Sequence, residues 1–241
     1  MSDPEISVVI PARNEAVNLR ELVPEISRAL DGRRHEIVIV DDGSTDDTAT
    51  VIADLAGRGA AVRRVPHRRS RGQSASVWSG ALAAVAPIIA TLDGDGQNDP
   101  RFILPLVAAL ADERIGLAAG QRVGRKDTVA KKVGSRIANR VRGAMLRDHT
   151  RDSGCGAKAF RREAFLRLPY FDTMHRFLPA LFAGDGWAVA HVDVVDRPRV
   201  RGRSNYGIFD RLAVGIPDLF GVWWLLRRRR RSPFRVEQDP K

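Results

Sequence analysis

Residues 6–42 have the sequence "ISVVIPARNEAVNLRELVPEISRALDGRRHEIVIVDD", in which two short apolar runs flank one helical pattern. The runs, at 6–11 and 36–42, are rich in valine and isoleucine and end in turn residues, which is typical of strands buried on both faces of a parallel sheet. Between them, apolar residues recur at helical spacing: Leu19, Leu22, Val23, Ile26 and Leu30. The stretch therefore predicts one β-α-β unit.

The same alternation continues to about residue 112. Residues 60–65 and 87–93 are predicted strands, and residues 73–85 between them are a predicted helix. Ser44, with Asp47 three residues later, resembles a capping box that starts another helix. Regular alternation of strands and helices predicts the α/β class, with a Rossmann-like, mainly parallel sheet flanked by helices.

The pattern changes after about residue 120. Residues 129–147 form a basic stretch with apolar residues four apart, and residues 187–196 are a predicted late strand. Residues 197–207, "RPRVRGRSNYG", are predicted to form a basic loop punctuated by glycine. An apolar segment with two tryptophans and a run of arginines follows. These basic stretches therefore lie far downstream of the alternating half.

The composition limits the classes of partner. The 241 residues carry a formal net charge of +11, and the sequence pI is about 10.9. Such a charge implies polyanionic partners: nucleic acid, phosphorylated substrates or an anionic membrane surface. One cysteine, Cys155, excludes an internal disulfide framework and fits a reducing compartment. We expect no signal peptide, and no stretch reaches the about 20 apolar residues of a membrane span.

Three predicted strands end in polar motifs: "PARNE" at 11–15, "DDGS" at 41–44 and "DGDGQNDP" at 93–100. Ligands of open parallel sheets bind beyond the carboxyl ends of the strands, so all three motifs are expected along one edge. The first motif has no glycine. Its composition therefore excludes a dinucleotide fingerprint, a P-loop and the glycine-rich loop of a sugar nucleotidyltransferase.

Asp93 and Asp95 form a D-x-D motif that indicates a metal site. Alternate residues of an extended segment project to one side, and Gly94 permits a tight turn between the two acids. Two carboxylates suit Mg²⁺ or Mn²⁺, which keep other coordination positions for water and phosphate, and Gln97 can add a carbonyl oxygen. The structural alternative, an Asx-turn and helix cap, explains Asp99 but not both upstream acids. Residues 98–100 are expected only to start the next helix.

Four further residues each have two interpretations. Asp41 and Asp42 suit a turn and a helix cap, but one of them can instead face the cleft and accept hydrogen bonds from a base or a ribose. His175 is either held by structural hydrogen bonds or close to an acceptor. Asp185, between two glycines, is either a turn residue or a general base.

The motifs "VVIPARNE", "IVIVDDGSTDDT", "TLDGDGQNDP" and "GRSNYG" together resemble family 2 glycosyltransferases. The resemblance covers residues 5–207 in order and is closest to the dolichyl- and polyprenyl-phosphate sugar synthases. It implies the GT-A fold and a metal that bridges the diphosphate of a nucleotide sugar. We therefore expect an inverting, metal-dependent hexosyltransferase with a polyprenyl phosphate acceptor.

The resemblance also implies roles for individual residues. The donor site is expected to comprise Pro11, Ala12, Asn14, Glu15, Asp42 and Asp93. The metal and diphosphate site is expected to comprise Asp93, Asp95 and Gln97. The residues that bind the two phosphate groups are expected to be Arg122, Lys131, Ser135, Arg199 and Ser204, and catalysis is expected to depend on Asp93, Asp95, Arg122 and Arg199. Lys131 stands where the family more often has arginine, and Asn205 where it more often has lysine.

The chemistry of this reaction agrees with the charges. A phosphate monoester has a second pKa near 6, so at neutral pH it is already an anionic nucleophile and needs no strong base. The acids would hold the metal and the basic residues the phosphates. A hydroxyl acceptor is the alternative, and it would need a base such as Asp185. A non-enzymatic binder of nucleic acid or membrane has no use for the acidic edge, and we expect no nucleic acid partner.

The C-terminal segment favours a membrane surface. Residues 208–241 combine apolar side chains, tryptophans and arginines, which suits a helix lying in the interface followed by a polybasic tail. The alternative is a helix that packs on the core. We therefore predict a catalytic domain at 1–207, an interfacial segment at 208–241, and a cytoplasmic protein bound peripherally to the cytoplasmic face of a membrane. The sequence is compatible with a homo-oligomer but does not predict one.

Overall fold

The computed structural model describes residues 3–123, 142–146, 148, 150–197 and 208–228. These residues form a seven-stranded sheet with the strand order β3-β2-β1-β4-β6-β5-β7. The strands are β1 (Ile6–Ala12), β2 (His35–Asp41), β3 (Val62–Pro66), β4 (Ile88–Thr91), β5 (Ile115–Arg122), β6 (Lys158–Arg161) and β7 (Ala188–Val194). The α/β class and the first four strands are confirmed, with ends shifted by one or two residues, as is the late strand at β7.

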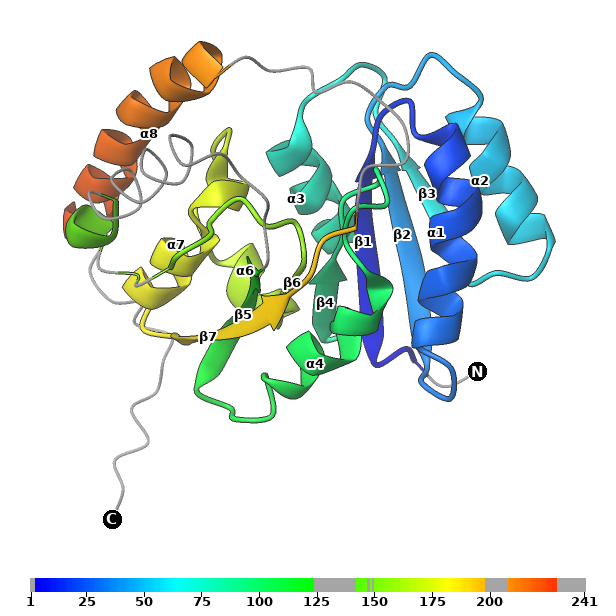
Figure 1. Ribbon diagram of the computed structural model, residues 1–241, viewed down its shortest axis with the longest axis horizontal. Coiled ribbons are helices and arrows are strands. Elements are labelled where there is room, and N and C mark those ends of the chain that lie inside the picture. Colours follow the sequence, from blue (N-terminus) through cyan, green and yellow to red (C-terminus); the bar gives the residue numbers. More distant parts are fainter. Residues whose placement is uncertain (1–2, 124–141, 147, 149, 198–207, 229–241) are drawn as a thin grey trace.

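Helices cover both faces of the sheet (Figure 1). They are α1 (Ala16–Ala29), α2 (Thr48–Gly57), α3 (Gln73–Ala83), η1 (Pro100–Phe102), α4 (Ile103–Ala108), α6 (Arg162–Leu166), η2 (Met174–Arg176), α7 (Leu178–Gly184) and α8 (Ile208–Arg228). Alternate residues of β1 belong to two cores: Val8 and Ile10 pack with α1, α2 and α4, whereas Val9 packs with α3, α6 and α7. Burial on both faces explains why β1 is apolar along most of its length.

The strand directions bring most of the polar motifs to one edge of the sheet. β1 runs parallel to β2 and β4, β2 to β3, and β5 to β7, whereas β6 is antiparallel to β4 and β5. The amino end of β6 therefore lies beside the carboxyl ends of its neighbours. Below, this edge is called the carboxyl edge. Neither β5 nor β6 is among the strands predicted from the sequence.

Two predicted helix starts have different outcomes. The capping box at Ser44 and Asp47 is wrong, because the Asp47 side chain makes no cap hydrogen bond. Asp46 takes that role, accepting hydrogen bonds from the backbone N–H and the hydroxyl of Thr48. The start at Asp99 is confirmed, since its carboxylate accepts a hydrogen bond from the backbone N–H of Arg101.

The last helix, α8, packs one face against the core and exposes another. Val222 is buried, and the Leu226 side chain packs against α7 at Gly184. Among the described residues, no helix is long and apolar enough to cross a membrane. The division of the chain at residue 208 stays a prediction. Of the basic stretch 129–147, only residues 142–146, which are helical, lie inside the described ranges.

Candidate active site

The D-x-D loop follows β4 and is closed by its own hydrogen bonds. The backbone N–H of Asp93 donates to Asn98 Oδ1 at 2.9 Å, and that of Gln97 donates to Asp95 Oδ1 at 3.1 Å. A Cβ on Gly94 would lie 2.9 Å from the carbonyl oxygen of Pro11, so the loop packs directly on the end of β1. Asn98 therefore does more than start a helix, in contrast to the expectation.

The Asp93 carboxylate lies against the turn that precedes β6. A Cβ on Gly156 would clash with Asp93 Oδ2, so only glycine leaves room for the carboxylate in this position. The Thr91 hydroxyl donates to the Gly156 carbonyl oxygen at 2.7 Å. From the other side, Gln73 Nε2 donates to Asp93 Oδ1 at 2.7 Å. Two segments distant in sequence, at Gln73 and at Gly156, thus converge on Asp93.

Arg122, at the end of β5, is bound by two carboxylates. Its Nε and Nη2 donate to the two oxygens of Asp152 at 2.6 and 2.8 Å, and its Nη1 donates to Asp196 Oδ2 at 3.4 Å. Burial opposes the charge, but the two carboxylates raise the pKa of Arg122. Arg122 therefore lies at the carboxyl edge, already paired with acids of its own chain.

Lys158 is a buried cation at the same edge. Its ammonium donates to the carbonyl oxygen of Cys155, and burial lowers its pKa. Burial, followed by repulsion from Asp95, raises the pKa of Asp93 to about 6, although Lys158 and Arg122 act in the opposite direction. Asp93 is therefore a carboxylate whose negative charge the surrounding residues neutralise incompletely.

The charges of this cluster fit a divalent cation. Within the described part of the chain, four carboxylates face two cations: Asp93, Asp95, Asp152 and Asp196 against Arg122 and Lys158. Among the described residues, no group of three or more histidine, cysteine, aspartate or glutamate side chains is placed to hold a metal. A cation here would therefore depend on Asp93, Asp95 and Gln97 together with oxygens of water or phosphate, as is usual for Mg²⁺.

Asp42, after β2, has a very different environment. Its Oδ1 accepts hydrogen bonds from the ring of His67 and the N–H of Arg71, and its Oδ2 accepts from the hydroxyl of Ser70 and the N–H of Gly72. Burial alone would raise the pKa of Asp42, but these donors lower it. The carboxylate expected to contact the nucleoside thus organises the loop at 67–72.

Asp41 forms the turn, as one of the two acids was expected to do. Its Oδ1 accepts from the N–H of Ser44, and its Oδ2 is paired with Arg64. The Ser44 hydroxyl accepts from the N–H of Asn14, whose own side chain accepts from the N–H of Thr45. Asn14 has a φ of 58°, a left-handed conformation that asparagine tolerates. The turns after β1 and β2 are therefore interlocked.

The carboxyl edge brings together many of the predicted site residues: Pro11, Ala12, Asn14, Glu15, Asp42, Asp93, Asp95, Gln97 and Arg122. Lys131, Ser135, Arg199, Ser204 and Asn205 lie outside the described residues. The individual roles of all these residues stay predictions.

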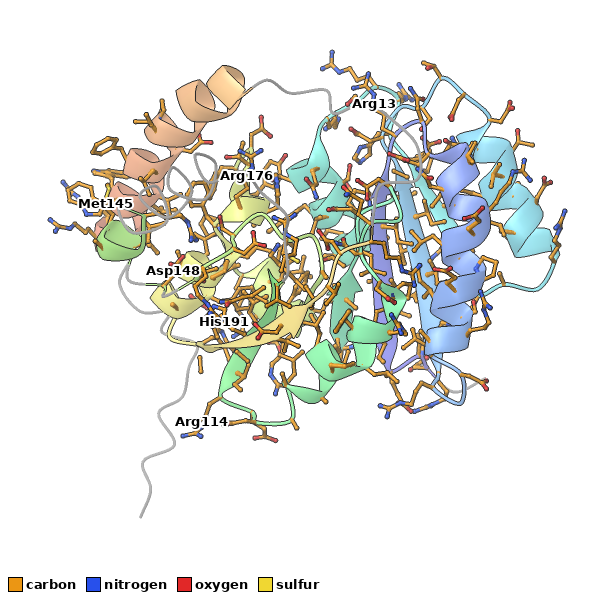
Figure 2. The ribbon with its side chains drawn as sticks, viewed as in Figure 1. Arg13, Arg114, Met145, Asp148, Arg176 and His191 are labelled. Atoms are coloured by element: carbon orange, nitrogen blue, oxygen red, sulfur yellow. The ribbon has the colours of Figure 1, made fainter. Side chains whose placement is uncertain are left out.

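The alternative base, Asp185, lies at the wrong edge of the sheet. β7 begins at Ala188, whose N–H donates to the carbonyl oxygen of Arg114 at 2.9 Å. Figure 2 shows Arg114 at the opposite end of the sheet from Arg13, which lies in the turn after β1. Asp185 is three residues before Ala188 and ends α7. It is therefore a turn residue, far from Asp93.

His175 makes structural hydrogen bonds to Ser74. Its backbone N–H donates to Ser74 Oγ at 3.2 Å, and its Nδ1 lies 2.8 Å from the same oxygen. The Ser74 hydroxyl therefore bonds both the backbone and the ring of His175. Burial, then the charges of Lys158 and Arg176, lower the pKa of His175 to about 3.

Several residues of the site were missed from the sequence: Gln73, Asp152, Lys158, Asp196 and Arg197. Most lie next to a strand or helix end, but none belongs to a recognisable motif. Lys158 begins β6 and Asp152 precedes it, so only the antiparallel insertion of this strand brings them to the carboxyl edge.

The fold is the GT-A fold of solved glycosyltransferases. The mannosyltransferase PcManGT from Pyrobaculum calidifontis, in complex with GDP-Man and Mn²⁺, matches with a TM-score of 0.68 at 23% identity, over 97% of this chain and 67% of its own. Glucosyl-3-phosphoglycerate synthase from Mycobacterium tuberculosis, in complex with phosphoglyceric acid, matches with a TM-score of 0.63 at 23% identity, over 95% and 82%.

The chain belongs to glycosyl transferase family 2, whose model matches residues 7–168. Dodecaprenyl-phosphate galacturonate synthase from Rhizobium johnstonii is 35% identical over 94% of this chain and 69% of the relative. Undecaprenyl-phosphate 4-deoxy-4-formamido-L-arabinose transferase from an Enterobacter species is 33% identical over 89% and 66%. The chain thus spans about two thirds of the length of these relatives.

Proposed function

We propose that this protein transfers a sugar from a nucleotide diphosphate sugar to a polyprenyl phosphate, with inversion at the anomeric carbon. The observation that carries the proposal is the gathering of Asp93 and Asp95 at the same edge of the sheet as the arginine that ends β5. The relatives named for dodecaprenyl and undecaprenyl phosphate support the acceptor class.

The donor would occupy the carboxyl edge between the turn after β1 and the loop at 67–72. Asp42 holds this loop through four hydrogen bonds, so it shapes the nucleoside site as well as offering an acceptor at its edge. Asp93, Asp95 and Gln97 would hold Mg²⁺ or Mn²⁺ next to the diphosphate. The bound cation would neutralise the charge that develops on the leaving diphosphate.

The acceptor needs positive charge rather than a base. Its phosphate is already ionised at neutral pH, so the protein must hold two anionic groups close together. Arg122 lies at the right edge, and its pairing with Asp152 and Asp196 fixes its direction. A hydroxyl acceptor would need a base, and Asp185 lies at the opposite edge. The position of Asp185 therefore gives no support to the hydroxyl alternative.

The test is transfer of a labelled sugar from a panel of UDP- and GDP-sugars to undecaprenyl phosphate with Mn²⁺. Glycolipid formation that stops when the acceptor phosphate is removed supports the proposal. Transfer to a free alcohol at an equal rate would instead support a hydroxyl acceptor.

We also propose that α8 rests on a membrane surface, where the lipid acceptor is met. Ile216, Phe220 and Trp224 recur every four residues along this helix and are 55%, 56% and 56% exposed. Arg227 and Arg228 follow them, and each guanidinium lies over a tryptophan ring, at 4.2 Å from Trp223 and 5.7 Å from Trp224. An apolar stripe next to cations suits an anionic lipid surface.

Flotation with vesicles that contain phosphatidylglycerol tests this surface. Replacement of Phe220 and Trp224 by serine should abolish flotation. The matched control replaces Leu82 and Val85, which are 56% and 59% exposed on and beside α3, and should float like the wild type. Equal flotation of both variants would contradict the assignment to α8.

A further inference from the structure

Arg197 joins the D-x-D loop to two other segments. Its backbone N–H donates to the carbonyl oxygen of Gln97 at 2.8 Å. Its side chain donates to Asp99 Oδ1 at 2.9 Å and to Glu25 Oε2 at 2.5 Å. Three contacts from one residue thus link the end of β7 to the D-x-D loop and to α1.

The residue before Arg197 adds to the same connection. Asp196 forms an isolated antiparallel bridge with Asn98, and its carboxylate accepts a hydrogen bond from Asn98 Nδ2 at 3.2 Å. Asn98 in turn accepts from the N–H of Asp93 at 2.9 Å. The position of the Asp93 backbone therefore depends on the end of β7.

We propose that Arg197 is a positioning residue for the D-x-D loop. It holds Gln97 and the cap at Asp99 in place. The inference rests on the proposed function, because it assigns a purpose to this link: Arg197 keeps the D-x-D loop in the position from which its acids would hold the cation. The planar fork of arginine suits two carboxylates at once, whereas lysine can satisfy only one well.

Arg101 provides a matched control. It binds the same Asp99 carboxylate, through Oδ2 at 2.6 Å, and its side chain is exposed. Arg197, by contrast, pairs with both Asp99 and Glu25. Loss of the Arg101 side chain removes an ion pair of Asp99 without releasing the loop from β7. A comparison of the two arginines therefore separates positioning from the mere charge balance of Asp99.

The experiment compares Arg197→Gln, Arg197→Lys and Arg101→Gln in the full chain. Mn²⁺ binding is measured by electron paramagnetic resonance without substrate, and transfer to undecaprenyl phosphate is measured across Mn²⁺ concentrations. We expect Arg197→Gln to weaken Mn²⁺ binding about tenfold and to lower kcat by about 10- to 100-fold. Arg197→Lys should recover part of this loss, and Arg101→Gln should stay within about twofold of the wild type.

Thermal unfolding of each variant separates a local effect from loss of the fold. Equal Mn²⁺ binding by Arg197→Gln and the wild type would overturn the proposal, as would equal losses in Arg197→Gln and Arg101→Gln. If the wild type binds Mn²⁺ but transfers no sugar to the lipid phosphate, the proposed function fails while the binding comparison still tests Arg197.

Discussion

Asp42 and Asp93 follow the two strands that flank β1, and their carboxylates have opposite surroundings. Asp42 accepts four hydrogen bonds from the loop at 67–72, and its pKa is lowered. Asp93 accepts one from Gln73, lies near Asp95, and has a pKa raised to about 6. Two aspartates at the same edge of the sheet thus differ. The Asp42 carboxylate is satisfied by hydrogen bonds, whereas the Asp93 carboxylate is crowded by another acid.

This difference separates structure from function. A carboxylate saturated by its own chain stabilises the fold and shapes a loop. A carboxylate kept near other acids destabilises the fold unless a cation from outside neutralises it. We therefore expect changes at Asp93 and Asp95 to affect activity most, and changes at Asp42 to affect stability as well.

The largest expected effect is the loss of the second acid of the motif. Asp95→Ala should lower sugar transfer by about a thousandfold, because the site then lacks a proposed metal ligand and the charge stabilisation of the leaving group that the metal would supply. EDTA should stop the wild type to a similar extent, and Mn²⁺ should restore it. Asp112→Asn, a change to an exposed acid paired with Arg114, serves as the control. Full activity of Asp95→Ala would contradict the metal site.

The second prediction concerns the glycine beneath Asp93. In Gly156→Ala, the new methyl group would overlap Asp93 Oδ2, so the carboxylate must move. Displacement of a reacting group by about 1 Å can cost about 100-fold in rate, and we expect a loss of that size in kcat. Gly57→Ala is the control, since nothing lies within 4 Å of its added Cβ. Similar rates for the two variants would refute the close packing.

The third prediction is that replacing Asp93 and replacing Asp42 by asparagine change the free energy of unfolding in opposite directions. Without metal at pH 8, Asp93→Asn should raise the free energy of unfolding by about 1–2 kcal/mol, because a carboxylate with a raised pKa is unfavourable when ionised. Asp42→Asn should lower it by about 1–3 kcal/mol, because buried donors lose their acceptor. Urea unfolding measures both. A lower free energy of unfolding for Asp93→Asn would contradict the difference inferred between Asp42 and Asp93.

Local sequence patterns explain which parts of the fold could be predicted. The apolar runs of β1 and β2 and the D-x-D motif are legible because each depends on adjacent residues. β5 was missed because it contains Gly116 and Gly120, where a Cβ would lie 2.7 Å from Trp187 and from the carbonyl oxygen of Ala157, respectively. Tight packing thus removes the bulky residues that mark strands. β6 has four residues and begins with a buried lysine, so its pattern is not apolar.

The site was predictable only where its residues share a motif. The acids of the D-x-D loop were found, but their neighbours Asp152, Lys158 and Asp196 come from segments around β6 and β7. Their proximity depends on the antiparallel direction of β6, which no local pattern encodes. The gathering of these charged groups is therefore a property of the fold rather than of any one stretch.

The smallest expected effect concerns His175, a group satisfied in its neutral form. In the folded protein its ring stays neutral down to about pH 3, whereas the unfolded chain takes up this proton near pH 6.5. Between these values the unfolded state binds one proton more, so His175 lowers the free energy of unfolding by about 1 kcal/mol per pH unit as the pH falls. His175→Gln should therefore show a shallower loss of stability between about pH 6 and 5 in urea unfolding. Parallel curves of stability against pH for the wild type and His175→Gln would mean that the His175 ring is protonated in the folded protein. The contrast between satisfied and crowded groups would then not extend to His175.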